Sequence, residues 1–153
     1  MQITFQLNGR DVSSEIEPHD LLIDLVRVGQ GLTGTKRSCD VQVCGACTVL
    51  LDGAPVSSCC TLAADADGRE VTTIEGFAAT PEFARFEDAF VRHAAVQCGF
   101  CTPGLMLTLK AMDDAGDART AEDVRHGLAG NLCRCTGYAS ILAAASEALG
   151  VQP

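Results

Sequence analysis

Nine cysteines, gathered in a few short stretches, constrain this 153-residue chain more than any other feature. Cys39, Cys44 and Cys47 are spaced C-x4-C-x2-C, and a fourth cysteine, Cys59, follows after a short interval. A second set of four lies further along the chain, at Cys98, Cys101, Cys133 and Cys135. An odd number of cysteines suits a closed disulfide framework poorly, and the N-terminal segment has no basic region typical of a signal peptide. The cysteines therefore predict metal binding rather than disulfides.

The spacing of the first set is that of the loop in plant-type [2Fe–2S] ferredoxins. Gly45 and Ala46 separate the second and third cysteines, and such small residues let backbone N–H groups approach a cluster. The alternative is a zinc site, but zinc prefers C-x2-C pairs in both halves of its ligand set. Cys59 and Cys60 compete for the fourth ligand position. We choose Cys59, which ends the returning strand of a predicted hairpin, and expect Cys60 to be a small buried side chain.

The second set is less specific, because C-x2-C followed at a distance by C-x-C suits both zinc and iron–sulfur centres. Its position adds information. Cys101 directly precedes Thr102-Pro103, a predicted helix start, and Cys133 and Cys135 precede the last predicted helix. Helix N-termini carry free N–H donors and a partial positive charge, which suit an anionic thiolate cluster.

Hydrophobic periodicity divides the chain in two. Residues 1–76 alternate with a period of two in several short runs, with Asn8-Gly9 as a hairpin turn and one short helix that Asp20 could cap. Beyond a predicted linker at 76–80, the period changes to about 3.6. Four helices are predicted there, starting near Thr80, Thr102, Thr120 and Tyr138, the first of them reaching Gln97. The expected fold class is α+β, with domains at 1–76 and 77–153.

Charge and motifs exclude several functions. The net charge is −9 and there is no basic run, so we do not expect nucleic acid or anionic membranes as partners. No apolar run approaches the roughly 18 residues of a membrane-spanning helix. The chain also has no phosphate loop and no dinucleotide fingerprint, and we predict no catalytic residue in it.

Four motifs resemble one known family. They are G-T-K at 34–36, C-G-A-C-T-V at 44–49, Q-C-G-F-C-T-P-G at 97–104 and N-L-C-R-C-T-G-Y at 131–138. Together they resemble the small iron–sulfur subunit of the molybdenum hydroxylases, the relatives of xanthine dehydrogenase, aldehyde oxidoreductase and carbon monoxide dehydrogenase. The resemblance implies an N-terminal β-grasp, plant-type ferredoxin domain followed by a C-terminal four-helix bundle. It also implies a [2Fe–2S] cluster in each domain.

The resemblance assigns roles residue by residue. The flavin-proximal, ferredoxin-type cluster would be held by Cys39, Cys44, Cys47 and Cys59. The molybdenum-proximal cluster of the bundle would be held by Cys98, Cys101, Cys133 and Cys135. Gln97 and Cys135 match the residues that contact the pterin. The chain departs from the family at two positions of the first loop, where Ser38 and Gln42 stand in place of glycines that are common in the family.

The function implied is electron transfer within a larger oxidoreductase. Electrons would pass from a molybdopterin cofactor on a large subunit through both clusters to FAD, often on a third, medium-sized subunit. The chain would not be catalytic alone. The alternative is a free-standing two-cluster carrier resembling a ferredoxin, for which an acidic surface suits docking to a basic reductase. The expected compartment is the cytoplasm, with a periplasmic location beside an exported partner left open.

Overall fold

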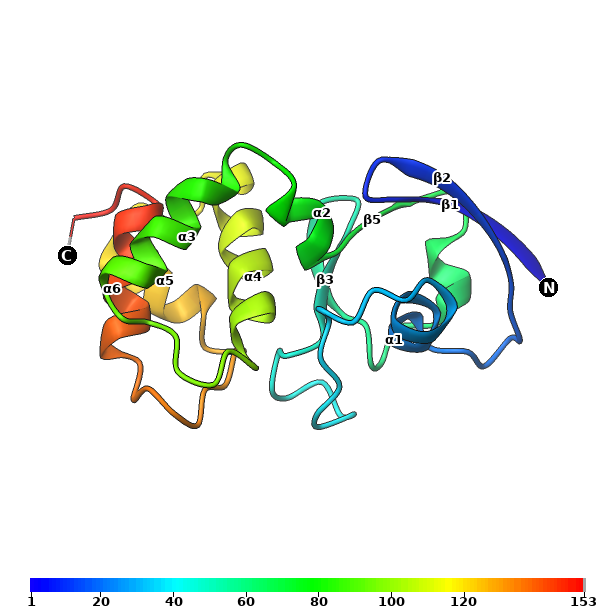
Figure 1. The fold of residues 1–153 in the computed structure, drawn as a ribbon, viewed down its shortest axis with the longest axis horizontal. Helices are drawn as coiled ribbons and strands as arrows, with labels where there is room; N and C mark the ends of the chain where they lie inside the picture. Colours follow the sequence, from blue (N-terminus) through cyan, green and yellow to red (C-terminus); the bar gives the residue numbers. More distant parts are fainter. Residues whose placement is uncertain (153) are drawn as a thin grey trace.

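The computed structural model describes residues 1–152 and shows two halves side by side along the long axis (Figure 1). One half holds the sheet and the N-terminus, and the other holds most of the helices and the C-terminus. No helix among residues 1–152 is long and apolar enough to cross a membrane.

A mixed five-stranded sheet forms the first half. Its spatial order is β2-β1-β5-β3-β4, with β1 and β5 parallel and the other neighbours antiparallel. The strands are β1 (Gln2–Leu7), β2 (Arg10–Glu15), β3 (Thr48–Leu51), β4 (Ala54–Ser57) and β5 (Glu70–Thr72). Along β1, Ile3, Phe5 and Leu7 are buried and their neighbours are exposed, as the alternation predicts. Asn8 and Gly9 both have positive φ, which confirms the predicted hairpin turn.

A short helical segment covers one face of this sheet. Helix α1 (Leu22–Asp24) continues as a wider π-helical turn (Leu25–Gly29), and a 3-10 turn (Ala63–Ala66) packs against α1. The expectation that Asp20 caps the helix is wrong. The Asp20 carboxylate accepts a hydrogen bond from Glu17 N at 2.8 Å and makes none to the helix. Burial of apolar side chains against the sheet therefore holds this segment in place.

The second half is helical. Its elements are α2 (Ile74–Ala78), α3 (Phe83–Arg92), α4 (Thr102–Ala115), α5 (Ala121–Gly127) and α6 (Ala139–Ala148). The last four are the predicted helices, although α3 ends at Arg92 rather than reaching Gln97. The expected linker at 76–80 is wrong, because α2 occupies most of it. Phe77 of α2 is fully buried, and its ring contacts the Phe83 and Phe86 rings edge-on at centroid distances of 5.1 and 5.3 Å.

Strand β3 connects the two halves. All four of its residues are buried, and Leu50 belongs to the hydrophobic core of the helices, whereas Val49 and Leu51 belong to the core of the sheet. Because side chains alternate across a strand, β3 supplies both cores at once. Helix α4 packs directly on β3. The start of α4 and the cysteine loop that precedes β3 are therefore brought close together.

Candidate metal centres

The first cysteine set lies on the loop before β3 and at the end of β4. Cys39 Sγ accepts hydrogen bonds from the backbone N–H groups of Val43 and Cys44, both at 3.4 Å. Backbone N–H groups, that of Val41 first, lower the pKa of Cys39 to about 6. The loop therefore wraps around this sulfur and favours its thiolate form, which is the form that binds metal.

The other two cysteines of this set are deeper. Cys47 and Cys59 are 2% and 4% exposed and pack with the fully buried Ile23. Burial raises the pKa of Cys47 to about 11, and the adjacent Cys59 thiol contributes to the shift. The first set thus consists of two pairs, an outer one of Cys39 with Cys44 and an inner one of Cys47 with Cys59.

Cys60 does not lie where it was expected. It is exposed, with its Sγ 3.7 Å from the Sγ of Cys59, so the expectation that it is buried is wrong. The chain turns directly after β4, and this turn directs Cys59 inward and Cys60 outward. The preference for Cys59 as fourth ligand stays a prediction, now with a geometric reason: Cys59 faces the buried Cys47.

The second set comes from two loops of the helical half. Cys98 and Cys101 lie between α3 and α4, and Cys101 is the N-cap residue of α4, as predicted. Cys133 and Cys135 lie between α5 and α6. Cys135 Sγ is 3.6 Å from Cys98 Sγ. Burial, followed by the adjacent Cys133 thiol, raises the pKa of Cys101 to about 12.

Hydrogen bonds around Cys133 act in the opposite direction. Burial raises its pKa, but the Thr136 hydroxyl, which donates to Cys133 Sγ at 3.2 Å, and the backbone N–H of Cys135 outweigh burial. The net pKa of Cys133 is about 7. This set also consists of two pairs, Cys98 with Cys135 and Cys101 with Cys133, each holding one thiol from either loop.

This pairing fits a binuclear cluster. Each iron of a [2Fe–2S] cluster takes two protein ligands. Two sulfurs bound about 2.3 Å from one tetrahedral metal lie about 3.8 Å apart, close to the 3.6 Å between Cys98 and Cys135. Within residues 1–152, no group of three or more His, Cys, Asp or Glu side chains surrounds a position for a single ion. The donors are thiols in pairs, as the cluster requires.

Tyr138 fixes the last cysteine loop. Its hydroxyl accepts a hydrogen bond from Cys133 N at 2.8 Å and donates one to Asn131 O at 3.3 Å. Tyr138 directly precedes α6 and has φ of 73°, a conformation that few non-glycine residues adopt. The hydroxyl thereby anchors the loop to the start of the helix.

The two cysteine loops contact each other. Leu132 N donates to Cys44 O at 2.9 Å, and Asn131 Nδ2 lies 3.4 Å from Gly45 O. Gly45 has φ of 68°, and a Cβ at this position would lie 2.5 Å from Gly130 O. A Cβ at Gly104 would collide with Gly45 O. The sequence analysis placed Gly45 beside a cluster, but its absent side chain is also what lets the two loops meet.

Gln97 is exposed on the loop between α3 and α4, and its Nε2 donates to Cys135 O at 3.2 Å. The structure therefore brings together the two residues predicted to contact the pterin. Three large apolar side chains near them in the sequence are partly exposed, Val96, Phe100 and Leu132, at 43%, 44% and 48%. Phe100 and Leu132 lie in the two loops that carry the second cysteine set.

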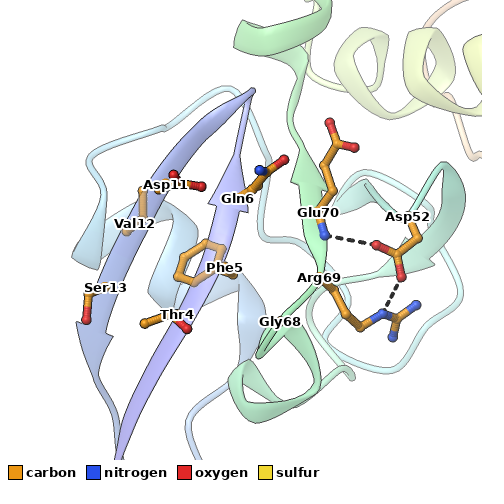
Figure 2. A pocket seen from close by; sticks show the side chains of 10 residues that line it. All are labelled: Thr4, Phe5, Gln6, Asp11, Val12, Ser13, Asp52, Gly68, Arg69 and Glu70. Carbon is orange, nitrogen blue, oxygen red and sulfur yellow. Dashed lines mark hydrogen bonds and ion pairs between the residues drawn. The ribbon is translucent and has the colours of Figure 1, made fainter.

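A large surface hollow lies elsewhere. It has a volume of about 620 Å³ and lies over β1, β2 and β5 (Figure 2). Asp52 accepts from Glu70 N at 2.9 Å and pairs with Arg69 at 2.6 Å along its edge. No cysteine lines this hollow, so it is separate from both metal centres.

Comparisons with known proteins agree with both centres. A family described as "2Fe-2S iron-sulfur cluster binding domain" matches residues 5–73, and one described as "[2Fe-2S] binding domain" matches residues 73–146. The first match contains one cysteine set and the second contains the other. The expectation of two [2Fe–2S] clusters, one in each half, is confirmed.

Whole-chain relatives agree with the two domain matches. The small subunit of nicotine 6-hydroxylase from Paenarthrobacter nicotinovorans is 43% identical over 98% of this chain and 90% of its own length. The xanthine dehydrogenase iron–sulfur-binding subunit of Escherichia coli O157:H7 is 45% identical over 89% of this chain and 86% of its own. A chain of quinoline 2-oxidoreductase from Pseudomonas putida 86 superposes with a TM-score of 0.91, at 43% identity over 97% of this chain and 93% of that one.

These likenesses confirm the predicted α+β fold, in which a ferredoxin-type domain precedes a helical domain. They extend over nearly the whole chain and include both cysteine sets. This chain therefore belongs to the small iron–sulfur subunits of the molybdenum hydroxylase family.

Proposed function

We propose that this chain is the electron-transfer subunit of a molybdenum-dependent hydroxylase or dehydrogenase. It would pass electrons from the molybdopterin centre of a large subunit, through two [2Fe–2S] clusters, to FAD on a medium subunit or to another acceptor. The observation that carries the proposal is the pair of complete cysteine sets, held in contact through their loops. The relatives named above are themselves subunits of oxidoreductases, which supports the same role.

The proposed ligands are the eight paired cysteines. The ferredoxin-type cluster would be held by Cys39, Cys44, Cys47 and Cys59, and the bundle cluster by Cys98, Cys101, Cys133 and Cys135. Bound [2Fe–2S] clusters supply one-electron redox chemistry. The chain supplies thiolates, backbone N–H groups and buried surroundings. Binding removes the thiol protons, and the high pKa values of Cys47 and Cys101 mean that these two sulfurs lose theirs only to the metal.

The contact between the loops supports transfer between the two centres. Leu132, whose N–H donates to Cys44 O, is joined covalently to Cys133. One hydrogen bond and a few covalent bonds thus separate a proposed ligand of one cluster from a proposed ligand of the other. An arrangement of two unrelated sites would have no need of this close approach.

The surface around Cys135 is the proposed contact with the molybdopterin subunit. Cys135 and Gln97 are exposed and joined by a hydrogen bond, so both can meet a pterin held by a partner. This feature also favours a permanent subunit over the alternative, a free-standing carrier. The partly exposed Phe100 and Leu132 near the same centre suit a lasting interface more than a transient one.

Two finer assignments belong to the proposal. We keep the division into domains at 1–76 and 77–153 as part of the proposal. The separate hydrophobic cores of the sheet and the helices support two units, although this boundary lies within α2, whose Ile74 already packs on the helical core. We also propose the cytoplasm as the compartment. The nine cysteines form no disulfide within residues 1–152, and thiols that hold clusters must stay reduced, as suits that compartment.

Metal analysis of the purified, reconstituted full chain tests the proposal. Two binuclear clusters require four iron atoms and four labile sulfides for each chain. Reduction should give two distinguishable electron paramagnetic resonance (EPR) signals. Stoichiometric zinc with little sulfide after reconstitution would contradict the proposal.

A further inference from the structure

One buried hydroxyl beside the ferredoxin-type loop lacks a hydrogen-bond partner. The Thr35 side chain is on a residue only 1% exposed, and its Oγ1 contacts no donor or acceptor. Buried hydroxyls in native proteins are nearly always paired, and an exception calls for an explanation such as a bound group. The other unpaired buried atom found in residues 1–152, Glu82 Oε1, lies 2.8 Å from Lys110 Nζ and is neutralised by it.

The backbone around Thr35 is held against the cysteine loop. Lys36 N donates to Ala46 O at 3.1 Å, and Ala46 directly precedes the buried Cys47. On the other side, Arg27 Nη1 donates to Thr35 O at 2.5 Å. The Thr35 hydroxyl therefore lies in a segment that is hydrogen-bonded to the loop of the proposed cluster ligands.

The second centre shows what such a hydroxyl can do. There, the Thr136 hydroxyl donates to Cys133 Sγ, a sulfur of the proposed ligand set, at 3.2 Å. Sulfur atoms bound to iron carry negative charge and accept hydrogen bonds readily. Reduction adds further negative charge to the cluster, so a donor stabilises the reduced form more than the oxidised form.

We propose that the Thr35 hydroxyl donates a hydrogen bond to a sulfur of the ferredoxin-type cluster and raises its reduction potential. The inference rests on the proposed ligand assignment. It gives Thr35 a defined role: it makes the ferredoxin-type centre a better electron acceptor relative to the bundle centre. The atom that accepts this hydrogen bond is a sulfur of the bound cluster, either a bridging sulfide or a cysteine thiolate.

The test is an EPR-monitored redox titration of the reconstituted full chain. Thr35→Val removes the hydroxyl and keeps the branched shape of the side chain. We expect about a tenfold loss in the equilibrium constant for reduction of the ferredoxin-type cluster, a potential about 59 mV lower for one electron. The bundle cluster in the same molecule serves as the reference and should not move. Thr35→Ser keeps the hydroxyl and should keep the potential near that of the wild type.

A matched control separates this effect from the loss of any buried hydroxyl. Thr108 is also buried, but its hydroxyl donates to Gly104 O at 2.9 Å. Thr108→Val should leave the potential of the ferredoxin-type cluster unchanged. Unchanged potentials in Thr35→Val would overturn the proposal.

Two further measurements keep the result decisive. Iron and sulfide are counted first, because a wild-type chain without two clusters counts against the proposed function, whereas full loading with unchanged potentials counts against Thr35 alone. If the valine variant does not retain the cluster, Thr35→Ser is compared with Thr35→Ala, and equal potentials in that pair overturn the proposal. Resonance Raman spectra in heavy water add a direct signature. The iron–sulfur frequencies should shift on deuteration more in wild type than in the variants without the hydroxyl.

Discussion

Each of the two centres has four cysteine thiols as ligands, but the centres are built in different ways. In the sheet half, one continuous loop supplies Cys39, Cys44 and Cys47, and backbone N–H groups of that loop surround the first sulfur. In the helical half, two loops more than thirty residues apart each supply two cysteines. Local sequence is therefore enough to specify most of the first centre, whereas the second exists only when the helices have packed.

The two centres also differ in how deeply their cysteines are buried. The first centre keeps the Cys47 and Cys59 pair deep in the protein, but the second exposes Cys98 and Cys135 together. A cluster held at the second centre would thus lie close to the surface of this chain. The difference agrees with the proposed role of the bundle centre. On one side it meets a large subunit that covers it, and on the other side it passes electrons to the ferredoxin-type centre inside this chain.

The largest effect is expected from removing one ligand of the bundle centre. Cys135→Ala should abolish the bundle cluster and reduce the iron content from four atoms to two, while the EPR signal of the ferredoxin-type cluster remains. Cys60→Ala is the control and should keep all four iron atoms, because Cys60 faces solvent. Loss of the ferredoxin-type signal in Cys135→Ala would show that the two cysteine sets have been assigned to the wrong clusters.

The next effect concerns the contact that joins the two centres. In Gly45→Ala, the new Cβ would collide with Gly130 O, and the alanine would have to adopt a positive φ. We therefore expect a loss of about 3 kcal/mol in the free energy of unfolding. Gly53→Ala has a similar positive φ but nothing within 4 Å of its Cβ, and should lose only about 1 kcal/mol. Denaturant titration measures both. Equal losses would mean that the loops do not need this close approach.

A functional effect with little change in stability is expected at the bundle surface. Gln97→Ala should leave both clusters in place and change the free energy of unfolding by less than about 0.5 kcal/mol, because the side chain is exposed. Turnover of the assembled complex should fall, since the pterin contact is lost. The control Gln6→Ala, on the exposed face of β1, should change neither the turnover nor the free energy of unfolding. Normal turnover in Gln97→Ala would contradict the proposed contact between Gln97 and the pterin.

The smallest effect is a gain. Gln42 adopts a φ of 57°, the left-handed conformation that glycine accepts without strain, so the glycine common in the family at this position has a structural reason. Gln42→Gly should raise the free energy of unfolding by about 1 kcal/mol. Ser38, the other departure from the family, has no positive φ, and Ser38→Gly should give no gain. A gain from Ser38→Gly alone would show that strain at Gln42 is not the reason.

Local patterns predicted much of the fold. The alternation in β1, the Asn8-Gly9 turn and the helix start at Thr120 are all present. Helix α3 ends early for a reason that the sequence conceals. Ala94 takes a positive φ, and Ala95 N donates to Phe90 O at 2.8 Å, an ending that glycine usually provides. With alanine there, composition favours continuing the helix.

Features that depend on tertiary contacts were missed. The segment at 76–80 contains Gly76 and reads as a linker, but the burial of Phe77 among other aromatic rings makes it part of the core. The outward orientation of Cys60 follows from a turn after β4, and no single residue of the sequence predicts this turn. Neither the unpaired Thr35 hydroxyl nor the contact of Leu132 with Cys44 has a sequence signal. Both require knowledge of which loops meet.

The central claim is that this chain works as a subunit of a larger enzyme, and native purification from its source tests it most directly. The full chain is captured under non-denaturing conditions, and copurifying proteins are identified by mass spectrometry. The account predicts a large molybdopterin-binding chain in a fixed ratio, with or without a flavin-binding chain. A chain that elutes alone, yet reduces and reoxidises both clusters, would contradict the account and establish an independent electron carrier.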